Sequence, residues 1–134
     1  MTWVQGHPTQ SGLERAAMQG LRCLAALNDG PALADQLCAL QGPVLIDGPR
    51  SGRGESADLT RVAALASRRP LVLAGGLSPE SVRAAIAQVR PAGVDVSSGV
   101  EHRRGEKDLG RIREFVQVAR AALDEAAGAA GGER

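Results

Sequence analysis

The clearest strand-to-helix unit of the chain lies at residues 71–89, which read LVLAGGLSPESVRAAIAQV. The apolar run that opens this stretch is too short for a helix and fits a buried strand. Gly75 and Gly76 end the run, and Ser78 followed by Pro79 is typical of a helix start, because serine caps the first turn and proline suits its first position. The apolar residues that follow keep helical spacing: Val82, Ala85, Ile86 and Val89. Residues 71–89 therefore predict one βα unit.

The same alternation of strand and helix extends along the chain on both sides of this unit. Further strands are predicted at residues 20–27, 44–46 and 94–97. Further helices are predicted over residues 11–21, 33–40, 59–66 and 109–123. This alternation predicts a parallel sheet with right-handed crossovers, either a doubly wound sheet or part of a barrel. We expect one folded domain over residues 1–124 and a flexible Ala/Gly-rich tail over residues 125–134.

Charge and aromatic content exclude several classes of partner. Lys+Arg total 16 and Asp+Glu total 15, so the net charge of +1 implies neither a nucleic-acid footprint nor a basic patch for a membrane surface. With one Trp and one Phe, the chain cannot build a surface that stacks on the bases of single strands.

Apolar runs and cysteines indicate the cellular compartment. The longest apolar runs fall far short of the roughly 18 residues that span a bilayer, and no charged-then-apolar leader opens the chain. We therefore expect a cytoplasmic protein that does not enter a membrane. Cys23 and Cys38 form neither a disulfide framework nor a metal-binding spacing, so we interpret both as core residues and expect no metal site.

The residues that could act chemically follow the predicted strands. In parallel α/β folds the functional groups gather at the carboxyl ends of the strands, which here carry Asp47, the Gly75-Gly76 pair and the stretch 95–101. Gly75-Gly76 before a helix start lets backbone N–H groups approach an anion, and Ser97-Ser98-Gly99 offers a second such loop. Two glycine loops after neighbouring strands predict a phosphate site, over which Gly52 and Gly54 could close.

Each of these features also has a purely structural interpretation. A Gly-Gly pair after a strand is often only a tight turn. Asp47 could cap the loop at residues 48–56, and Asp95 could pair with an arginine at the rim of the sheet. The presence of two such loops together strengthens the phosphate-binding hypothesis.

Three stretches in the second half of the chain form a long and specific pattern. They read LAGGLSPESV at residues 73–82, RPAGVDVSSGVE at residues 90–101 and GEKD at residues 105–108. Together they resemble the C-terminal region of the phosphoribosylanthranilate isomerase family of tryptophan biosynthesis. LIDG at residues 45–48, with the following Gly52 and Gly54, resembles that family's sixth strand and loop, and WVQGH at residues 3–7 more weakly resembles its fourth strand.

The resemblance implies a (β/α)8 barrel enzyme that needs no cofactor. The reaction would be an Amadori rearrangement of N-(5-phosphoribosyl)anthranilate to 1-(2-carboxyphenylamino)-1-deoxyribulose 5-phosphate. The family's general acid falls on Asp47, which would protonate the ribose ring oxygen and open the ring to a Schiff base. The anthranilate-side aspartate falls on Asp95. The phosphate ligands fall on Gly75, Gly76, Ser98 and Gly99, with Ser97 beside them.

Two catalytic features of the family have no counterpart in this sequence. The family opens with a strand bearing a Lys-Ile-Cys-Gly motif, whose cysteine removes the C2 proton as general base, and a substrate-side arginine follows its second strand. Gly6 and Pro8 also interrupt the expected Gln-Leu-His-Gly pattern. We therefore expect an incomplete barrel that contains about strands four to eight. Such an open arc leaves two unpaired edges and an exposed core.

Three hypotheses address the missing units. A separate polypeptide could supply strands one to three as a complementing N-terminal half-barrel. Two copies could instead pair as a homodimer, which would put the strand of Cys23 in place of the absent first strand and make Cys23 a surrogate base, although its context LRCL does not match the lost motif. The chain could also be a catalytically inactive phosphosugar-binding module that lacks the general base. We favour the isomerase role over this third hypothesis.

Overall fold

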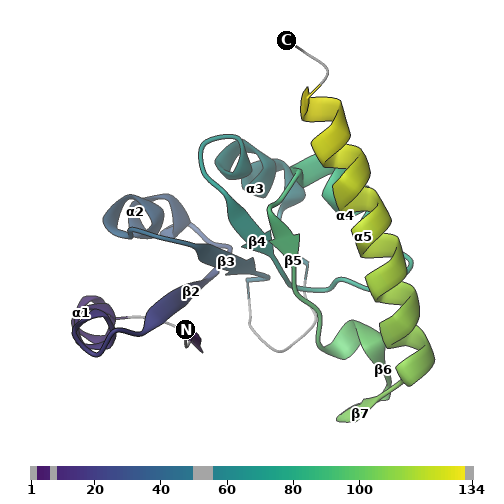
Figure 1. Ribbon diagram of the computed structural model, residues 1–134, viewed down its shortest axis with the longest axis horizontal. Helices are drawn as coiled ribbons and strands as arrows, with labels where there is room; N and C mark the ends of the chain where they lie inside the picture. The colour runs from purple at the N-terminus through teal and green to yellow at the C-terminus, as the bar shows by residue number, and fades with distance from the viewer. Residues whose placement is uncertain (1–2, 7–8, 50–55, 132–134) are drawn as a thin grey trace.

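A five-stranded parallel sheet forms the main layer of the computed structural model, which describes residues 3–6, 9–49 and 56–131 (Figure 1). The strands are β1 (Trp3–Gly6), β2 (Arg22–Asn28), β3 (Val44–Asp47), β4 (Leu71–Leu73) and β5 (Gly93–Val94). The crossover helices are α1 (Gln10–Met18), α2 (Leu33–Ala39), α3 (Leu59–Ala66) and α4 (Val82–Val89). The chain after β5 forms the 3-10 turn η1 (Ser98–Val100), the hairpin strands β6 (Glu101–Arg103) and β7 (Glu106–Lys107), and the helix α5 (Leu109–Gly131).

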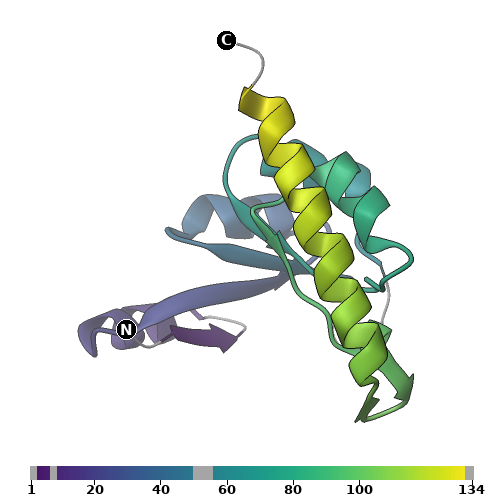
Figure 2. The ribbon, with the colours of Figure 1, turned by 45° about the vertical axis from the view of Figure 1, so that its right-hand side comes forward.

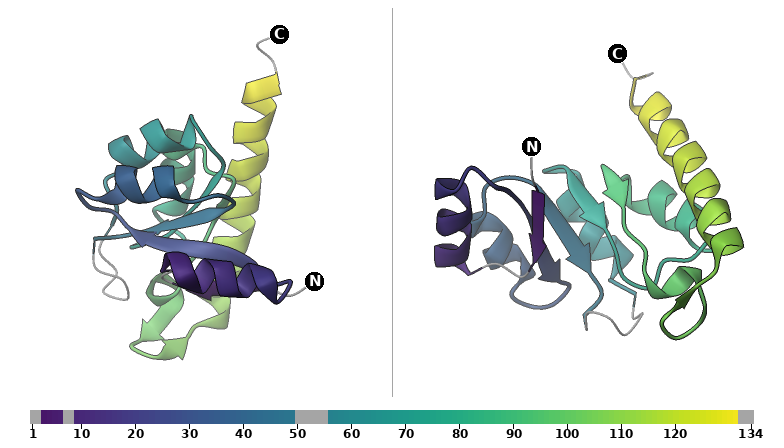
Figure 3. Two further views of the ribbon diagram at one scale, coloured as in Figure 1. Left: turned by 90° about the vertical axis from the view of Figure 1, so that its left-hand side faces the viewer. Right: turned by 60° about the horizontal axis from the view of Figure 1, so that its bottom comes forward.

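The spatial order of the strands is the same as their order along the chain. Each neighbouring pair from β1 to β5 is parallel, which confirms the predicted parallel α/β fold. A doubly wound sheet reverses its strand order at a switch point, and no reversal occurs among the described strands. In the part of the chain that the structure describes, β1 and β5 each pair on one side only, so the sheet is open. Figure 3 shows α1 and α5 at opposite ends of this sheet.

Side-chain alternation gives the sheet two different faces. On β3, the fully buried Val44 and Ile46 point to the face that the crossover helices cover, which we call the helix face. This face contains most of the core, from Leu33 of α2 to Phe115 of α5. The opposite face holds a small apolar cluster of three buried residues with Leu24 and Val72 beside them: Ala26, Leu45 and Ala74.

A buried carboxylate connects the end of β2 to the start of α3. Asp29 is 6% exposed and accepts hydrogen bonds from the backbone N–H of Asp58 at 2.6 Å and from Nη1 of Arg61 at 2.8 Å. Asp58 in turn caps α3 by accepting from the N–H groups of Thr60 and Arg61. These bonds fix α3 against the carboxyl end of the neighbouring strand.

The chain after β4 differs from the sequence prediction in four places. α4 begins at Val82 with Ser81 as its N-cap, whereas the predicted cap Ser78 and Pro79 lie in the turn before it. β5 ends at Val94, although the N–H of Asp95 still donates to the Leu73 carbonyl at 2.9 Å. The polar stretch before α5 forms the β6–β7 hairpin, which lies below the start of α5 in Figure 1. Residues 125–131, expected in a flexible tail, are the last turns of α5 (Figure 2). In these turns Ala126 packs on the core and Glu125 pairs with Arg83 of α4.

Among the described residues, no helix combines the length and the apolar character needed to cross a bilayer.

The helix face should dominate the stability of the fold. Ile46→Ala removes a fully buried side chain between the sheet and its helices, and we expect it to lower the free energy of unfolding by about 2–5 kcal/mol. Leu109→Ala is the control, because Leu109 is 69% exposed and its truncation should change stability by less than about 0.5 kcal/mol. Urea unfolding followed by circular dichroism measures both, and equal effects would contradict this description of the core.

Candidate functional site

Four residues of the opposite face form one layer at the carboxyl end of the sheet. Asn28 of β2 is in register with Asp47 of β3. The ladder continues one step beyond the assigned strands, because the N–H of Ala74 donates to the Ile46 carbonyl and the N–H of Asp95 donates to that of Leu73. Asp47, Ala74 and Asp95 are therefore neighbours across three strands, with the two carboxylates on either side of a small residue. Two strand spacings place the Cα atoms of these aspartates about 10 Å apart.

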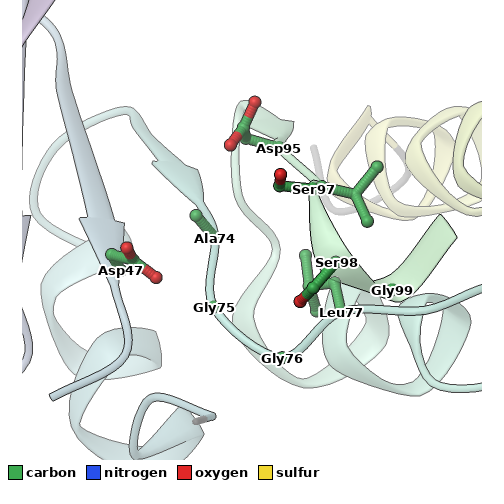
Figure 4. Close-up of a pocket in the computed structure, with 10 residues that line it drawn as sticks. Asp47, Ala74, Gly75, Gly76, Leu77, Asp95, Ser97, Ser98 and Gly99 are labelled. Atoms are coloured by element: carbon green, nitrogen blue, oxygen red, sulfur yellow. The ribbon is translucent and has the colours of Figure 1, made fainter. Parts of the chain in front are cut away.

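A cavity of about 70 Å³ opens beside this layer. Figure 4 shows Asp47 on one side of it, Ser97 and Ser98 on the other, and the Gly75-Gly76 backbone between them. The lining comprises Asp47, Ala74, Gly75, Gly76, Leu77, Asp95, Val96, Ser97, Ser98 and Gly99. The structure thus brings together the strand-end aspartates and both glycine loops that the sequence singled out. The cavity is small, so it suits a compact group.

The loop after β4 adopts a conformation that requires glycine. Gly75 has φ 85° and Gly76 has φ 66°, both in the left-handed region that residues with a Cβ rarely adopt. The chain then enters the turn before α4, where the N–H of Ser78 donates to Oγ of Ser81 at 3.0 Å.

The second loop packs directly on the first. A Cβ added to Gly99 would lie 1.7 Å from the Leu77 carbonyl oxygen and 2.8 Å from its carbon. Glycine at position 99 therefore permits the backbone of η1 to lie against the backbone of the β4–α4 loop, and this contact joins the two loops into one wall of the cavity.

Two cations hold the second loop from outside the cavity. Nζ of Lys107 donates to the carbonyl oxygen of Ser97 at 2.8 Å, to its Oγ at 3.1 Å and to Oε1 of Glu101 at 2.7 Å. Arg111 of α5 donates to the Gly99 carbonyl through Nε at 3.2 Å and Nη2 at 3.0 Å. The Lys107 bond, followed by that of the Gly105 N–H, lowers the pKa of Glu101.

The guanidinium of Arg111 also reaches the loop that precedes α4. Its Nη1 and Nη2 donate to the two carboxylate oxygens of Glu80 at 2.9 and 3.1 Å. Hydrogen bonds from the Ser78 side chain and then from Arg111 lower the pKa of Glu80 to about 2. Arg111 therefore bridges the two glycine-bearing loops through Gly99 and Glu80.

The structure does not bring Cys23 to the cavity. Cys23 lies near the start of β2, in register with Val4 of β1, and alternation puts it on the helix face with Ala25 and Leu27. Asn28 marks the level of the cavity and lies five residues further along the strand, or about 16 Å. Within one chain, Cys23 is therefore on the other face of the sheet and at its other end.

Two further expected site residues and the metal-ligand groups remain. Gly52 and Gly54 lie outside the described residues. Among residues 3–6, 9–49 and 56–131, no group of three or more His, Cys, Asp and Glu side chains is arranged to hold a metal ion.

Sequence reasoning missed Asn28, Lys107 and Arg111. Nδ2 of Asn28 donates to the Gly48 carbonyl at 2.9 Å, and the Gly48 N–H donates to Oδ1 of Asp47 at 2.8 Å, so Asn28 fixes the chain at the residue that follows Asp47. Asn28 could have been found from the pairing of β2 with β3, because that register places it beside Asp47. No local pattern marks Arg111, whose partners lie 12 and 31 residues away.

The sequence that forms this cavity matches a known protein family. A family profile described as N-(5'-phosphoribosyl)anthranilate (PRA) isomerase matches residues 25–118, which include both glycine loops and both strand-end aspartates. The chain belongs to the phosphoribosylanthranilate isomerase family.

Individual members of the family agree with this assignment. N-(5'-phosphoribosyl)anthranilate isomerase of Roseiflexus castenholzii is 58% identical over 77 residues, which are 58% of this chain and 36% of that protein. The crystal structure of phosphoribosyl anthranilate isomerase from Thermotoga maritima superposes with TM-score 0.77 at 34% identity and covers 90% of this chain. Another isomerase structure, in complex with reduced 1-(o-carboxyphenylamino)-1-deoxyribulose 5-phosphate, has TM-score 0.74 at 34% identity and also covers 90% of this chain.

The chain is shorter than the family members it matches. It covers 62% of the Thermotoga maritima chain and 60% of the chain in the complex. The described fold is therefore similar to part of a phosphoribosylanthranilate isomerase.

Gly99→Ala tests the contact between the two loops. The added methyl group cannot avoid the Leu77 carbonyl without moving backbone, so we expect the free energy of unfolding to fall by more than about 1 kcal/mol. Gly93→Ala is the matched control, because its Cβ would meet only Cγ2 of Val72 at 3.9 Å. Thermal unfolding compares the two variants, and an equal loss would show that the loops do not pack in this way.

The Glu80 carboxylate should titrate well below its ordinary range. Its pKa in the folded chain is about 2 against 4.5, so the folded state binds this proton less tightly than the unfolded state. Its contribution to stability is complete above pH 4.5 and is lost as the pH falls through 2. Carbon-detected NMR titration should give a midpoint near 2 that rises in R111M and stays constant in R83M. A midpoint that is the same in both variants would contradict the contribution assigned to Arg111, which is second to that of Ser78.

Proposed function

We propose that this chain forms the carboxyl-terminal part of a phosphoribosylanthranilate isomerase and acts in tryptophan biosynthesis. The reaction is the Amadori rearrangement of N-(5-phosphoribosyl)anthranilate to 1-(2-carboxyphenylamino)-1-deoxyribulose 5-phosphate. One observation supports this most directly: a single cavity at the carboxyl end of a parallel sheet joins Asp47 and Asp95 to two glycine loops. The related isomerase in complex with a reduced form of that product supports the same substrate class.

The phosphate of the substrate binds at the two loops. Backbone N–H groups at Gly75, Gly76, Ser98 and Gly99 are suited to a phosphate, because glycine lets the backbone approach an anion closely. Ser97 and Ser98 supply hydroxyl groups at the cavity wall.

The two aspartates have different roles in this proposal. Asp47, held by the N–H of Gly48, protonates the ribose ring oxygen, and the C1–O bond breaks to give the Schiff base. Removal of the C2 proton then moves the electron pair into the C1–C2 bond and quenches the iminium, which gives the enolamine that tautomerises to the ketone. Asp95 lies at the same level on the far side of Ala74 and faces the anthranilate end of the substrate.

The base that removes the C2 proton comes from outside the described sheet. Cys23 is remote from Asp47 within one chain, and the open edges at β1 and β5 are where further strands would pair. We infer that β1 to β5 correspond to strands four to eight of a (β/α)8 barrel. A polypeptide carrying strands one to three would then close the barrel and supply the base.

A catalytically inactive phosphosugar-binding module is the second candidate. The remote position of Cys23 favours it, because the cavity keeps its glycine loops whether or not a base is present. A homodimer whose subunits complete each other is the third arrangement, in which β1 is displaced and β2 of one copy, the strand of Cys23, takes the place of the absent first strand beside the cavity of the other.

Complementation separates these candidates. We expect the purified chain alone to leave the fluorescence of phosphoribosylanthranilate unchanged, and a mixture with a fragment carrying strands one to three of a complete isomerase to consume it. Turnover by the chain alone that disappears in Cys23→Ser would establish the homodimer instead. A folded, associated mixture without turnover would contradict the isomerase role and favour the binding module.

Asp47→Asn tests the general acid in the active mixture. The amide cannot donate an acid proton to the ring oxygen, so kcat should fall by about 10²–10⁴-fold while the affinity for ribose 5-phosphate stays constant. Asp124→Asn on the exposed surface of α5 is the control and should retain full turnover. Retained turnover in Asp47→Asn would exclude Asp47 as the acid.

A further inference from the structure

The phosphate cavity has an unfavourable charge distribution. Its described lining contains Asp47 and Asp95 but no Lys, Arg or His side chain. An ionised carboxylate near an incoming phosphate repels it, and neither aspartate attracts it. Backbone N–H groups and charges just outside the cavity must therefore provide the attraction.

Lys107 and Arg111 do not line the cavity, but each donates to the backbone carbonyl of a residue that does. Both carbonyls belong to the same loop. Lys107 uses three hydrogen bonds, two of them to Ser97 and one to Glu101. An ammonium has three N–H donors, so these bonds occupy all of them. Arg111 directs Nε and Nη2 to the Gly99 carbonyl. The first and third residues of the Ser97–Gly99 loop thus each have their carbonyl oxygen on a cation.

This arrangement controls the direction of the peptide dipoles in the loop. In a trans peptide the C=O and the following N–H point to opposite sides, so a Ser97 carbonyl that points to Lys107 directs the N–H of Ser98 away from Lys107. A carbonyl oxygen turned toward the cavity would repel a phosphate. Each cation therefore keeps an acceptor out of the site. Lys107 also leaves the Ser98 N–H available to it, whereas the N–H that follows the Gly99 carbonyl, that of Val100, donates to the Ser97 carbonyl at 3.4 Å.

From these contacts we infer that Lys107 and Arg111 are positioning residues for the phosphate loop, which hold the Ser97 and Gly99 carbonyls away from a bound phosphate and add positive charge behind it. This inference rests on the proposed phosphate site. Neither residue touches the substrate in this account.

Other ion pairs of the chain provide matched controls. Arg83 of α4 pairs with Glu125 of α5, the helix that also contains Arg111. Arg103 pairs with Glu106 in the hairpin that contains Lys107. These two ion pairs do not include a residue of the Ser97–Gly99 loop. R83M and R103M therefore remove a comparable charge without releasing either carbonyl.

Isothermal titration of the full chain with inorganic phosphate tests the inference. We expect K107M and R111M each to bind phosphate about tenfold more weakly than the unaltered chain, the loss expected from one charge-assisted hydrogen bond. R83M and R103M should stay within twofold, and R111K should recover part of the affinity. The loss should persist at 0.5 M NaCl, because long-range attraction is screened there whereas loop geometry is not.

A second readout reports on the loop without phosphate. Amide hydrogen exchange of Ser98 and Gly99 should accelerate in K107M and R111M and remain unchanged in R83M and R103M. Equal phosphate affinity in all four variants would overturn the positioning role. So would a loss of affinity in K107M and R111M that vanishes at 0.5 M NaCl while amide exchange stays unchanged. Either result would leave the proposed phosphate site in place. If the folded, unaltered chain fails to bind phosphate, the proposed site falls and this inference falls with it.

Discussion

One register through β2, β3, β4 and β5 fixes the position of each aspartate proposed to act on substrate. Asp47 and Asp95 face the cavity because Val44, Ile46, Leu71 and Leu73 are buried on the helix face. A one-residue slip of β3 would turn Asp47 into the core and Ile46 out of it, at the cost of burying a carboxylate and exposing an apolar side chain. The apolar core beneath the helices therefore also determines which side chains meet at the opposite face.

The loops above the sheet depend on this register in turn. Once β4 and β5 are paired, their following loops lie side by side, and the absence of a side chain at Gly99 lets the two backbones touch. Arg111 then connects both loops to the first turn of α5, while Lys107 connects the second loop to the hairpin. The cavity is accordingly a wall of backbone groups with its charged supports on the outside, which is an arrangement suited to an oxyanion.

Short-range patterns predicted most of this fold and the end of the sheet at which the cavity lies. Apolar runs indicated the strands, and parallel strands end at one edge, so Asp47, Asp95 and the two glycine loops were expected to gather there. Contacts between distant segments had no such signal: Asp29 with Arg61, and Arg111 with Gly99, depend on how loops pack after folding. Tertiary packing of Ala126 accompanies the continuation of α5 through a segment whose composition suggested a frayed tail.

The open sheet and the loop cavity are separate features, since β1 and β5 each pair on one side only among the described strands, whereas the proposed phosphate site uses groups of this chain alone. NMR chemical-shift mapping with ribose 5-phosphate tests the latter claim most directly. The account predicts that the amides of Gly75, Gly76, Ser98 and Gly99 shift together and saturate with one dissociation constant, while those of α2 remain in place. Shifts that centre on α2, or separate dissociation constants for the two loops, would contradict a single phosphate site formed by both.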